Sequence, residues 1–348
     1  MFARFNPKPM DLMRRIIVLL IAVLCCAGSA HAAAQPTPAT IVIKFSHVAA
    51  PQAHKSKGAE RFKKLAEEYT GGRVRIALYP NSQLYKDKEE LEALQLGAVE
   101  ILAPSLSKFG PLGIKAFEVF DIPYLFRDTA ELARITEGPI GRDILDKLET
   151  KGITGLGYWN NGFKILSANK PLLRPDDLLG LKVRIQSSRV IEEQMTALGA
   201  LPQVLAFSEA YQALSSGVVD GTENPPANFF NQNMFQVQRH ATLTYHGFLG
   251  YAVIVNQKFW TGLPDDIRSA LERALRDATP YANAEAAKEN ADALAAVTKS
   301  GKTAMHDPTP DERKSWEAAL LPVRGRIADR VGRDLLARIE TELSRSGP

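Results

Sequence analysis

The chain has 348 residues, with 43 lysines and arginines and 39 aspartates and glutamates, and a formal net charge of +4. Its first 32 residues hold four of those basic residues and one acid, so the remainder carries 39 basic and 38 acidic residues, a net charge of +1. Such a balance gives no argument for binding nucleic acid or a membrane surface. Both cysteines also lie in the first 32 residues, which excludes thiol catalysis and thiolate metal sites from the rest.

The N-terminus has the order of a secretory signal peptide, with basic residues, then an apolar run over 16–27, then Ala30-His31-Ala32. The apolar run is shorter than the ~20 residues that a membrane-spanning helix needs. We predict cleavage after Ala32, with Ala34 as the alternative. Because leucine or cysteine precedes Cys25 and Cys26, we expect no lipid anchor. The product is expected to be exported, which in a two-membrane bacterium means periplasmic.

The remaining residues exceed what one core usually supports, so we expect two domains. Short β-branched runs predict strands over 41–47, 73–79, 99–103, 153–159, 182–186, 201–206 and 251–257. Amphipathic patterns predict helices over 56–69, 87–96, 190–198, 209–215 and 310–343. This alternation indicates an α/β fold of parallel or mixed sheets with helices on both faces.

Enzyme signatures are absent from the sequence. It has no G-x-S-x-G elbow, no H-E-x-x-H pair and no phosphate-binding P-loop. The histidines beyond residue 32 are scattered, and we interpret them as solvated or hydrogen-bonded rather than as metal ligands: His47, His54, His240, His246 and His306. We therefore expect no cofactor, no metal and no catalytic residue.

The segment GLKVRIQSS places an arginine inside a strand pattern. Val183 and Ile185 point to one face of that strand and Arg184 to the other. A guanidinium can bind a carboxylate through two parallel N–H bonds, so a small anion is the obvious partner. The residues alone favour a solvated or ion-paired surface arginine, since charged side chains are mostly exposed.

A resemblance to a known family favours the anion-binding interpretation of Arg184 over the surface one. The segments KFSHV, YPNSQL, YWNNGFKILSANKPL, GLKVRIQSS, LGALPQVLAFSEAYQAL and VDGTENP occur in the order and spacing of the solute-binding subunits of TRAP transporters, over roughly residues 41–323. The chain most resembles their C4-dicarboxylate-binding branch. The resemblance implies a two-domain periplasmic-binding-protein-like fold with hinge strands and a long bracing helix. That helix would span 265–299, with Pro280 near its middle. It also implies domains built from discontinuous segments, 40–161 plus 250–289 and 162–249 plus 290–345.

The resemblance also implies a set of ligand-binding residues. Arg184 matches the carboxylate clamp of the family, Asn224 its ligand-facing asparagine, and Phe207 an aromatic cleft wall. Lys164 stands where sialic-acid-binding relatives have a second arginine, and Ser105 where they have an acid. Lys57 and Asn161 match further cleft positions. The implied ligand is a small dicarboxylate such as succinate, fumarate or malate, delivered by a monomeric binding protein to a membrane permease driven by an ion gradient.

Three alternatives remain open at this point. Sister branches use the same arginine for keto acids, monocarboxylates or aromatic acids. The bound protein could also signal to a sensor kinase rather than a permease. A secreted hydrolase would need a nucleophile such as Ser187 or Ser188 beside a histidine, and nothing in the sequence indicates that pairing.

Overall fold

The computed structural model describes residues 1–3 and 40–345. The predicted signal peptide and its cleavage site lie outside the described residues. The strands are β1 (Ile41–Ser46), β2 (Val74–Tyr79), β3 (Ile101–Leu102), β4 (Ile153–Phe163), β5 (Ile165–Ala168), β6 (Lys182–Ile185), β7 (Leu201–Val204), β8 (Gly221–Asn224), β9 (His240–Thr242), β10 (Phe248–Asn256) and β11 (Ala304–His306).

The α-helices are α2 (His54–Tyr69), α3 (Glu90–Gln95), α4 (Thr129–Thr136), α5 (Pro139–Asp146), α6 (Arg189–Ala197), α7 (Ala210–Ser215), α8 (Pro226–Asn231), α9 (Gln257–Thr261), α10 (Asp265–Ser300), α11 (Pro310–Val331) and α12 (Arg333–Ser344). Short 3₁₀ turns connect them: η1 (Leu106–Lys108), η2 (Lys115–Asp121), η3 (Lys147–Lys151), η4 (Pro175–Leu178), η5 (Phe207–Glu209) and η6 (Met234–Gln236). The predicted helix over 265–299 is confirmed as α10.

The strands form two mixed sheets. The first has the order β2-β1-β3-β10-β4 and the second β11-β9-β5-β8-β6-β7. In the first, β1 is parallel to β2 and β3, while β10 is antiparallel to β3 and β4. In the second, β6 is parallel to β7 and β8, and β5 is antiparallel to β8 and β9. Two mixed sheets with helices packed on them confirm the predicted α/β class.

The chain passes between the sheets more than once. β4 belongs to the first sheet, and after Lys164 the chain continues directly into β5 of the second. β9 of the second sheet is followed by β10, which returns to the first and pairs with β4 along most of its length. Two register shifts interrupt that pairing, at Leu249/Gly250 and at Val253/Ile254. Such irregularities bend and twist a strand pair.

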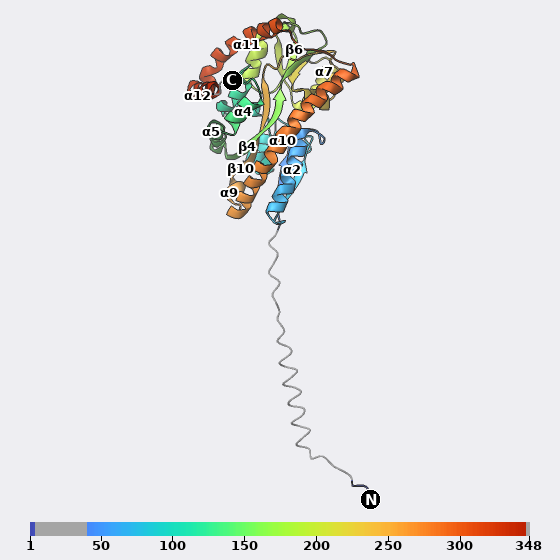
Figure 1. The fold of residues 1–348 in the computed structure, drawn as a ribbon, viewed down its shortest axis with the longest axis vertical. Coiled ribbons are helices and arrows are strands. Elements are labelled where there is room, and N and C mark those ends of the chain that lie inside the picture. Colours follow the sequence, from blue (N-terminus) through green and yellow to red (C-terminus); the bar gives the residue numbers. More distant parts are fainter. Residues whose placement is uncertain (4–39, 346–348) are drawn as a thin grey trace. The chain divides into compact units, whose positions relative to one another are not determined.

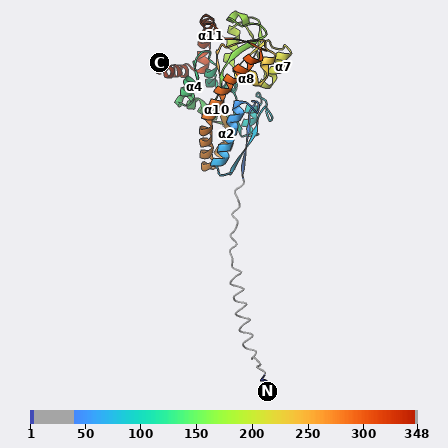
Figure 2. The ribbon, with the colours of Figure 1, turned by 45° about the vertical axis from the view of Figure 1, so that its right-hand side comes forward.

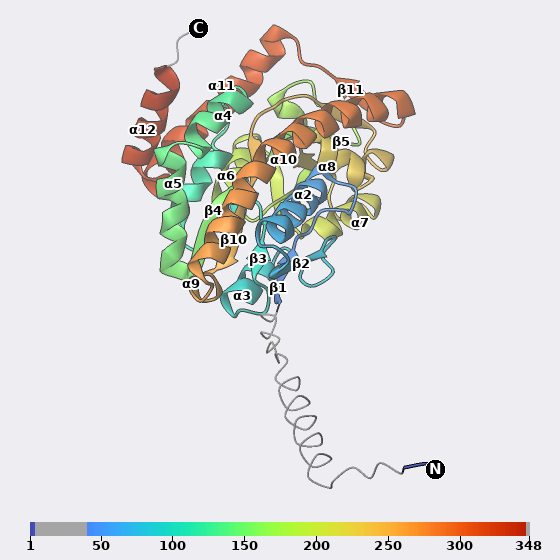
Figure 3. The same cartoon turned by 60° about the horizontal axis from the view of Figure 1, so that its bottom comes forward.

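Helix α10 spans 36 residues and packs on α2, on β4 and on α8. Figures 1 and 3 show it running beside α2, and Figure 2 shows α8 next to it. Its amide side chains bind strand backbone: Asn283 accepts from the Asn160 N–H at 2.8 Å, and Asn290 donates to the Asn161 carbonyl at 2.7 Å. The long helix therefore fastens the strand that links the two sheets.

The apolar stripe of α2 fixes how that helix faces the first sheet. Lys55, Ala59, Phe62 and Ala66 are all buried and follow the spacing of one helix face. The three apolar residues pack in a core with the strands of the first sheet and the N-terminal half of α10. Lys55 extends this stripe at its N-terminal end, so a charged side chain begins a buried face.

Candidate functional site

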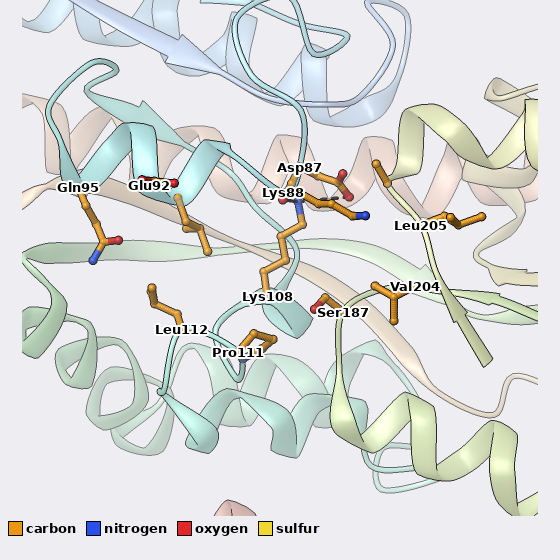
Figure 4. A pocket seen from close by; sticks show the side chains of 12 residues that line it. Asp87, Lys88, Glu92, Gln95, Lys108, Pro111, Leu112, Ser187, Val204 and Leu205 are labelled. Atoms are coloured by element: carbon orange, nitrogen blue, oxygen red, sulfur yellow. Dashed lines mark hydrogen bonds and ion pairs between the residues drawn. The ribbon is translucent and has the colours of Figure 1, made fainter.

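Two adjoining cavities lie where residues of the first sheet face residues of the second. The larger one has a volume of about 310 Å³. Figure 4 shows Asp87 and Lys88, on the loop before α3, and Val204 and Leu205, at the end of β7, on opposite sides of it. The smaller cavity, of about 20 Å³, shares Asp87 and Lys108 with the larger one.

The polar and aromatic lining of the smaller cavity comes mainly from the carboxyl ends of strands. Ser105 follows β3, Gln186 follows β6, Phe207 follows β7, and Asn224 ends β8. Open α/β sheets place their ligands at this edge. Lys55 at the start of α2 and Tyr251 on β10 also line this cavity. The predicted site residues Ser105, Phe207 and Asn224 are therefore brought together around one cavity.

Arg184 lies on β6 and is fully buried. It lines neither cavity itself, but Leu205, which it contacts, lines the larger one, and Phe207 lines the smaller one. Arg184 Nε and Nη2 donate to the Leu205 carbonyl at 3.0 and 2.8 Å, and its Nη1 has no partner among residues 1–3 and 40–345. Its Cζ lies 5.9 Å from the centre of the Phe207 ring. Burial lowers the pKa of Arg184, an effect that Asp87 and other nearby carboxylates oppose. A solvated surface arginine is excluded by this burial.

Lys55 is the second buried cation at the cavity. Its Nζ donates to the Ala103 carbonyl at 2.9 Å and lies 3.5 Å from the centre of the Tyr251 ring. Burial lowers the pKa of Lys55 to about 7; Glu90 and Asp87 raise it and Lys108 lowers it further. A buried ammonium held by one carbonyl and an aromatic face has capacity left for an anion.

Among the described residues, four lysines and arginines are buried: Lys55, Lys108, Lys164 and Arg184. Lys108 pairs with Glu90 at 2.7 Å and with Asp87 at 3.4 Å. Lys164 pairs with Glu223 at 2.8 Å and with Asp121 at 3.7 Å. Within the described ranges, Lys55 and Arg184 have no carboxylate within 4.0 Å. These two side chains are the unpaired cations of the site.

Lys57 and Lys164, both predicted from the sequence, lie elsewhere. Lys57 is two residues beyond Lys55 on α2, about 200° around the helix, and pairs with Glu285 of α10 at 2.8 Å with 42% of its side chain exposed. Lys164 lies at the end of β4 and is enclosed by its two carboxylates. Neither lines the two cavities.

The predicted amide residues have defined partners. Asn224 donates to Thr222 Oγ1 at 3.0 Å. Asn161 does not line the cavities but donates to Asn228 at 3.0 Å and to the Tyr251 hydroxyl. Since Asn228 and Tyr251 do line the smaller cavity, Asn161 orients part of its wall from behind.

Several residues that line the smaller cavity were not predicted as site residues from the sequence, among them Lys55, Asp87, Lys108 and Gln186. The sequence does contain a sign that Lys55 is buried, because its spacing to Ala59, Phe62 and Ala66 places it on the buried face of α2. Lys57 lies off that face. Nothing local distinguishes Asp87 from the charged residues that follow it. Its position depends on a contact with Phe207, 120 residues away.

The described part of the chain offers little for a hydrolase or a metal site. The Ser188 hydroxyl donates to Asp121 at 2.8 Å, and neither it nor Ser187 has a histidine partner there. Residues 1–3 and 40–345 contain no group of three histidine, cysteine or acidic side chains placed to hold a metal ion. None of the helices in those ranges combines the length and apolar character needed to cross a bilayer.

Comparison with known proteins places these features in a family. Residues 45–330 match the family model DctP, described as bacterial extracellular solute-binding protein, family 7. The C4-dicarboxylate-binding periplasmic protein DctP of Rhodobacter capsulatus is 58% identical over 331 residues, which is 94% of this chain and 98% of the relative. The protein of the same name from Vibrio cholerae is 38% identical, covering 93% of this chain and 97% of its own.

Solved structures agree in fold. A TRAP periplasmic solute-binding protein from Sulfurospirillum deleyianum, with bound succinate, has a TM-score of 0.84 at 42% identity, covering 87% of this chain and 99% of its own. One from Pseudomonas aeruginosa, with bound L-malate, has a TM-score of 0.80 at 42% identity, covering 82% of this chain and 99% of its own. The predicted two-domain binding-protein fold is thereby confirmed.

Proposed function

The chain belongs to family 7 of the bacterial extracellular solute-binding proteins, and we propose that it captures a C4-dicarboxylate such as succinate, fumarate or malate for a TRAP-type secondary transporter. Two relatives are named for C4-dicarboxylates, and two similar structures hold succinate and L-malate. The protein binds its ligand without converting it. It acts in the periplasm as a monomer, after its signal peptide is cleaved near Ala32.

The observation that carries this proposal is a pair of buried cations that have no carboxylate partner in the described part of the chain. Arg184 reaches the site from the second sheet and Lys55 from the first. A dicarboxylate supplies one anionic group to each, whereas a monocarboxylate leaves one cation buried and unpaired, which is costly. We therefore assign one carboxylate to Arg184 and the other to Lys55, in place of Lys57 and Lys164.

The residues in and next to the cavities have distinct roles. Arg184 Nη1 is free to donate to a carboxylate while Nε and Nη2 hold the guanidinium on the Leu205 carbonyl. Asn224 and Ser105 add uncharged hydrogen-bonding groups, and Phe207 forms an apolar wall. Asn161 holds the Tyr251 hydroxyl and so fixes the ring beneath Lys55.

Ligand capture proceeds by hinge closure between two domains, 40–161 plus 250–289 and 162–249 plus 290–345. β4 and β10 run close to the crossings between them and carry the register shifts that allow bending. Each domain contributes one unpaired cation, so the anion favours the closed arrangement through contacts that the open one lacks. The closed complex then presents a single surface to the permease.

A panel of organic acids tests the proposal. Thermal shift and calorimetry should show binding of succinate, fumarate and malate with Kd on the order of micromolar, about 8 kcal/mol. A ligand at a thousand times its Kd stabilises the folded state by about 4 kcal/mol. Butyrate, with one carboxylate on the same carbon skeleton, is the matched control and should bind markedly less well. Tighter binding of butyrate or of a neutral sugar would contradict the assignment.

A further inference from the structure

Buried hydrogen-bonding donors and acceptors that have no partner among the described residues lie in or next to the cavities. Arg184 Nη1 and Gln186 Nε2 are buried donors, and Asp87 Oδ1 is a buried acceptor. The carboxylates of a dianion can satisfy the donors, but they offer no hydrogen to Asp87. A buried acceptor without a donor costs free energy, and an ionised one costs more than a neutral one.

Contacts with both sheets hold Asp87 firmly. Its Oδ2 accepts from the Phe207 N–H at 3.2 Å and lies 3.4 Å from Lys108 Nζ, while its backbone carbonyl accepts from the same Nζ at 2.7 Å. Its side chain is 9% exposed. Asp87 lines both cavities. Because its other oxygen and its backbone are held by these contacts, the protein and not the solvent sets the direction of its free oxygen.

We propose that Asp87 Oδ1 accepts a hydrogen bond from the hydroxyl of a bound 2-hydroxy dicarboxylate, so that the site distinguishes malate from succinate. This inference rests on the proposed function, because the two carboxylates must first be held by Lys55 and Arg184. The hydroxyl is the one donor that malate has and ionised succinate lacks. Sites built to hydrogen-bond a ligand hydroxyl discriminate strongly against analogues without it.

The charge of Asp87 also favours malate over succinate. A carboxylate beside a dianion repels it unless a hydrogen lies between them, and the ion pair with Lys108 offsets only part of that repulsion. Succinate meets the repulsion without compensation, whereas malate places its hydroxyl hydrogen against Oδ1. Hydrogen bonds to charged groups correspond to roughly 10- to 100-fold in affinity. We expect the unmodified protein to bind one enantiomer of malate more tightly than succinate by a factor in that range.

Calorimetry with Asp87→Ala tests the assignment. The variant should bind malate and succinate with Kd values within about threefold of each other, because malate loses its hydrogen bond and succinate no longer meets the repulsion. Glu89→Gln is the matched control, since it removes a carboxylate two residues away that is exposed and outside both cavities. It should keep the preference of the unmodified protein. An unchanged preference in Asp87→Ala would overturn the inference.

A ligand-side measurement keeps the test independent of whether the variant folds. 2-Fluorosuccinate is close to malate in size but has no hydroxyl hydrogen, and it should bind the unmodified protein no more tightly than succinate does. Binding as tight as that of malate would contradict the role of Asp87. Equal Kd values for malate and succinate in the unmodified protein would refute this inference alone. Failure of both acids to bind would refute the proposed function with it.

Discussion

Lys55 and Lys57 stand two residues apart on α2, yet the first lies buried against the Tyr251 ring and the second lies half in solvent against Glu285. The turn of an α-helix separates them by about 200°. A shift of two positions along α2 decides whether a lysine ammonium lies at the cavity or pairs with Glu285 of α10. The pair therefore gives a matched comparison between a ligand-binding lysine and a structural one.

Lys55→Met and Lys57→Met should separate these roles. We expect Lys55→Met to weaken succinate binding by about 2–5 kcal/mol, since it leaves one ligand carboxylate buried without its cation. Lys57→Met removes a partly exposed ion pair and should change affinity and stability by no more than about 1 kcal/mol. Calorimetry and urea unfolding of both variants check this. Equal losses of affinity in the two would contradict the assignment.

Affinity should also depend on pH through Lys55. Its pKa of about 7 in the free protein means that it loses its proton as the pH rises through neutrality. Binding of a dianion requires the charged form, so binding takes up a proton above that pH and Kd rises, at most tenfold per pH unit. Between pH 7 and pH 8.5 we expect a weakening of about 15-fold.

Calorimetry in buffers of different ionisation enthalpy measures the proton uptake directly. The charged or titratable groups near Lys55 are Glu90, Asp87, Lys108, His47 and His54. Burial lowers the pKa of His47 to about 3, so His47 stays neutral across this range. A constant Kd from pH 6.5 to 8.5 would show that Lys55 remains charged in the free protein.

Lys164→Met should damage the fold rather than the ligand site. Burial raises the pKa of Asp121 and of Glu223, and Lys164 is the main group that opposes the rise in each. Removing the cation leaves two buried carboxylates unpaired, at a cost of about 3–5 kcal/mol in the free energy of unfolding. Urea unfolding measures this. The folded fraction should bind succinate with nearly the parent affinity, and a large loss of affinity with unchanged stability would restore Lys164 as a ligand residue.

Arg184 should tolerate neither shortening nor loss of its planar group. Arg184→Lys keeps the charge but cannot reach the Leu205 carbonyl and a ligand together, and should cost at least about 1.5 kcal/mol of binding. Arg184→Ala should cost more, about 2–5 kcal/mol. Arg189→Ala, on the exposed end of α6, is the control. Parent-like affinity in a folded Arg184→Ala would exclude the clamp.

The sequence predicts the fold where one face of an element is exposed. The strand over 41–47 and the helix over 56–69 follow their observed counterparts closely, because their apolar and polar positions alternate with the right period. β8 has the sequence GTEN with all four residues buried, and no alternation marks it. The predicted helix over 310–343 is two helices, because Gly332 adopts a φ of 100° between α11 and α12.

The sequence predicts which types of residue form the site better than it predicts the positions of those residues in the chain. Arg184 stands out because an arginine within a strand pattern is unusual, and the structure buries it against Leu205 and Phe207, which line the cavities. The second cation does not stand out, since lysines open many helices and only the buried stripe of α2 separates Lys55 from Lys57. Asp87 meets Phe207 across the chain, and no local pattern encodes a contact between segments so far apart.

The most direct measurement compares succinate with succinamate, in which a neutral amide replaces one carboxylate, in the unmodified protein and in Lys55→Met. If Lys55 pairs with the second carboxylate, the unmodified protein prefers succinate by about 2 kcal/mol or more, and Lys55→Met loses that preference. Such a cycle isolates the coupling between one side chain and one ligand group. A preference for succinate that survives intact in Lys55→Met would contradict the two-cation account.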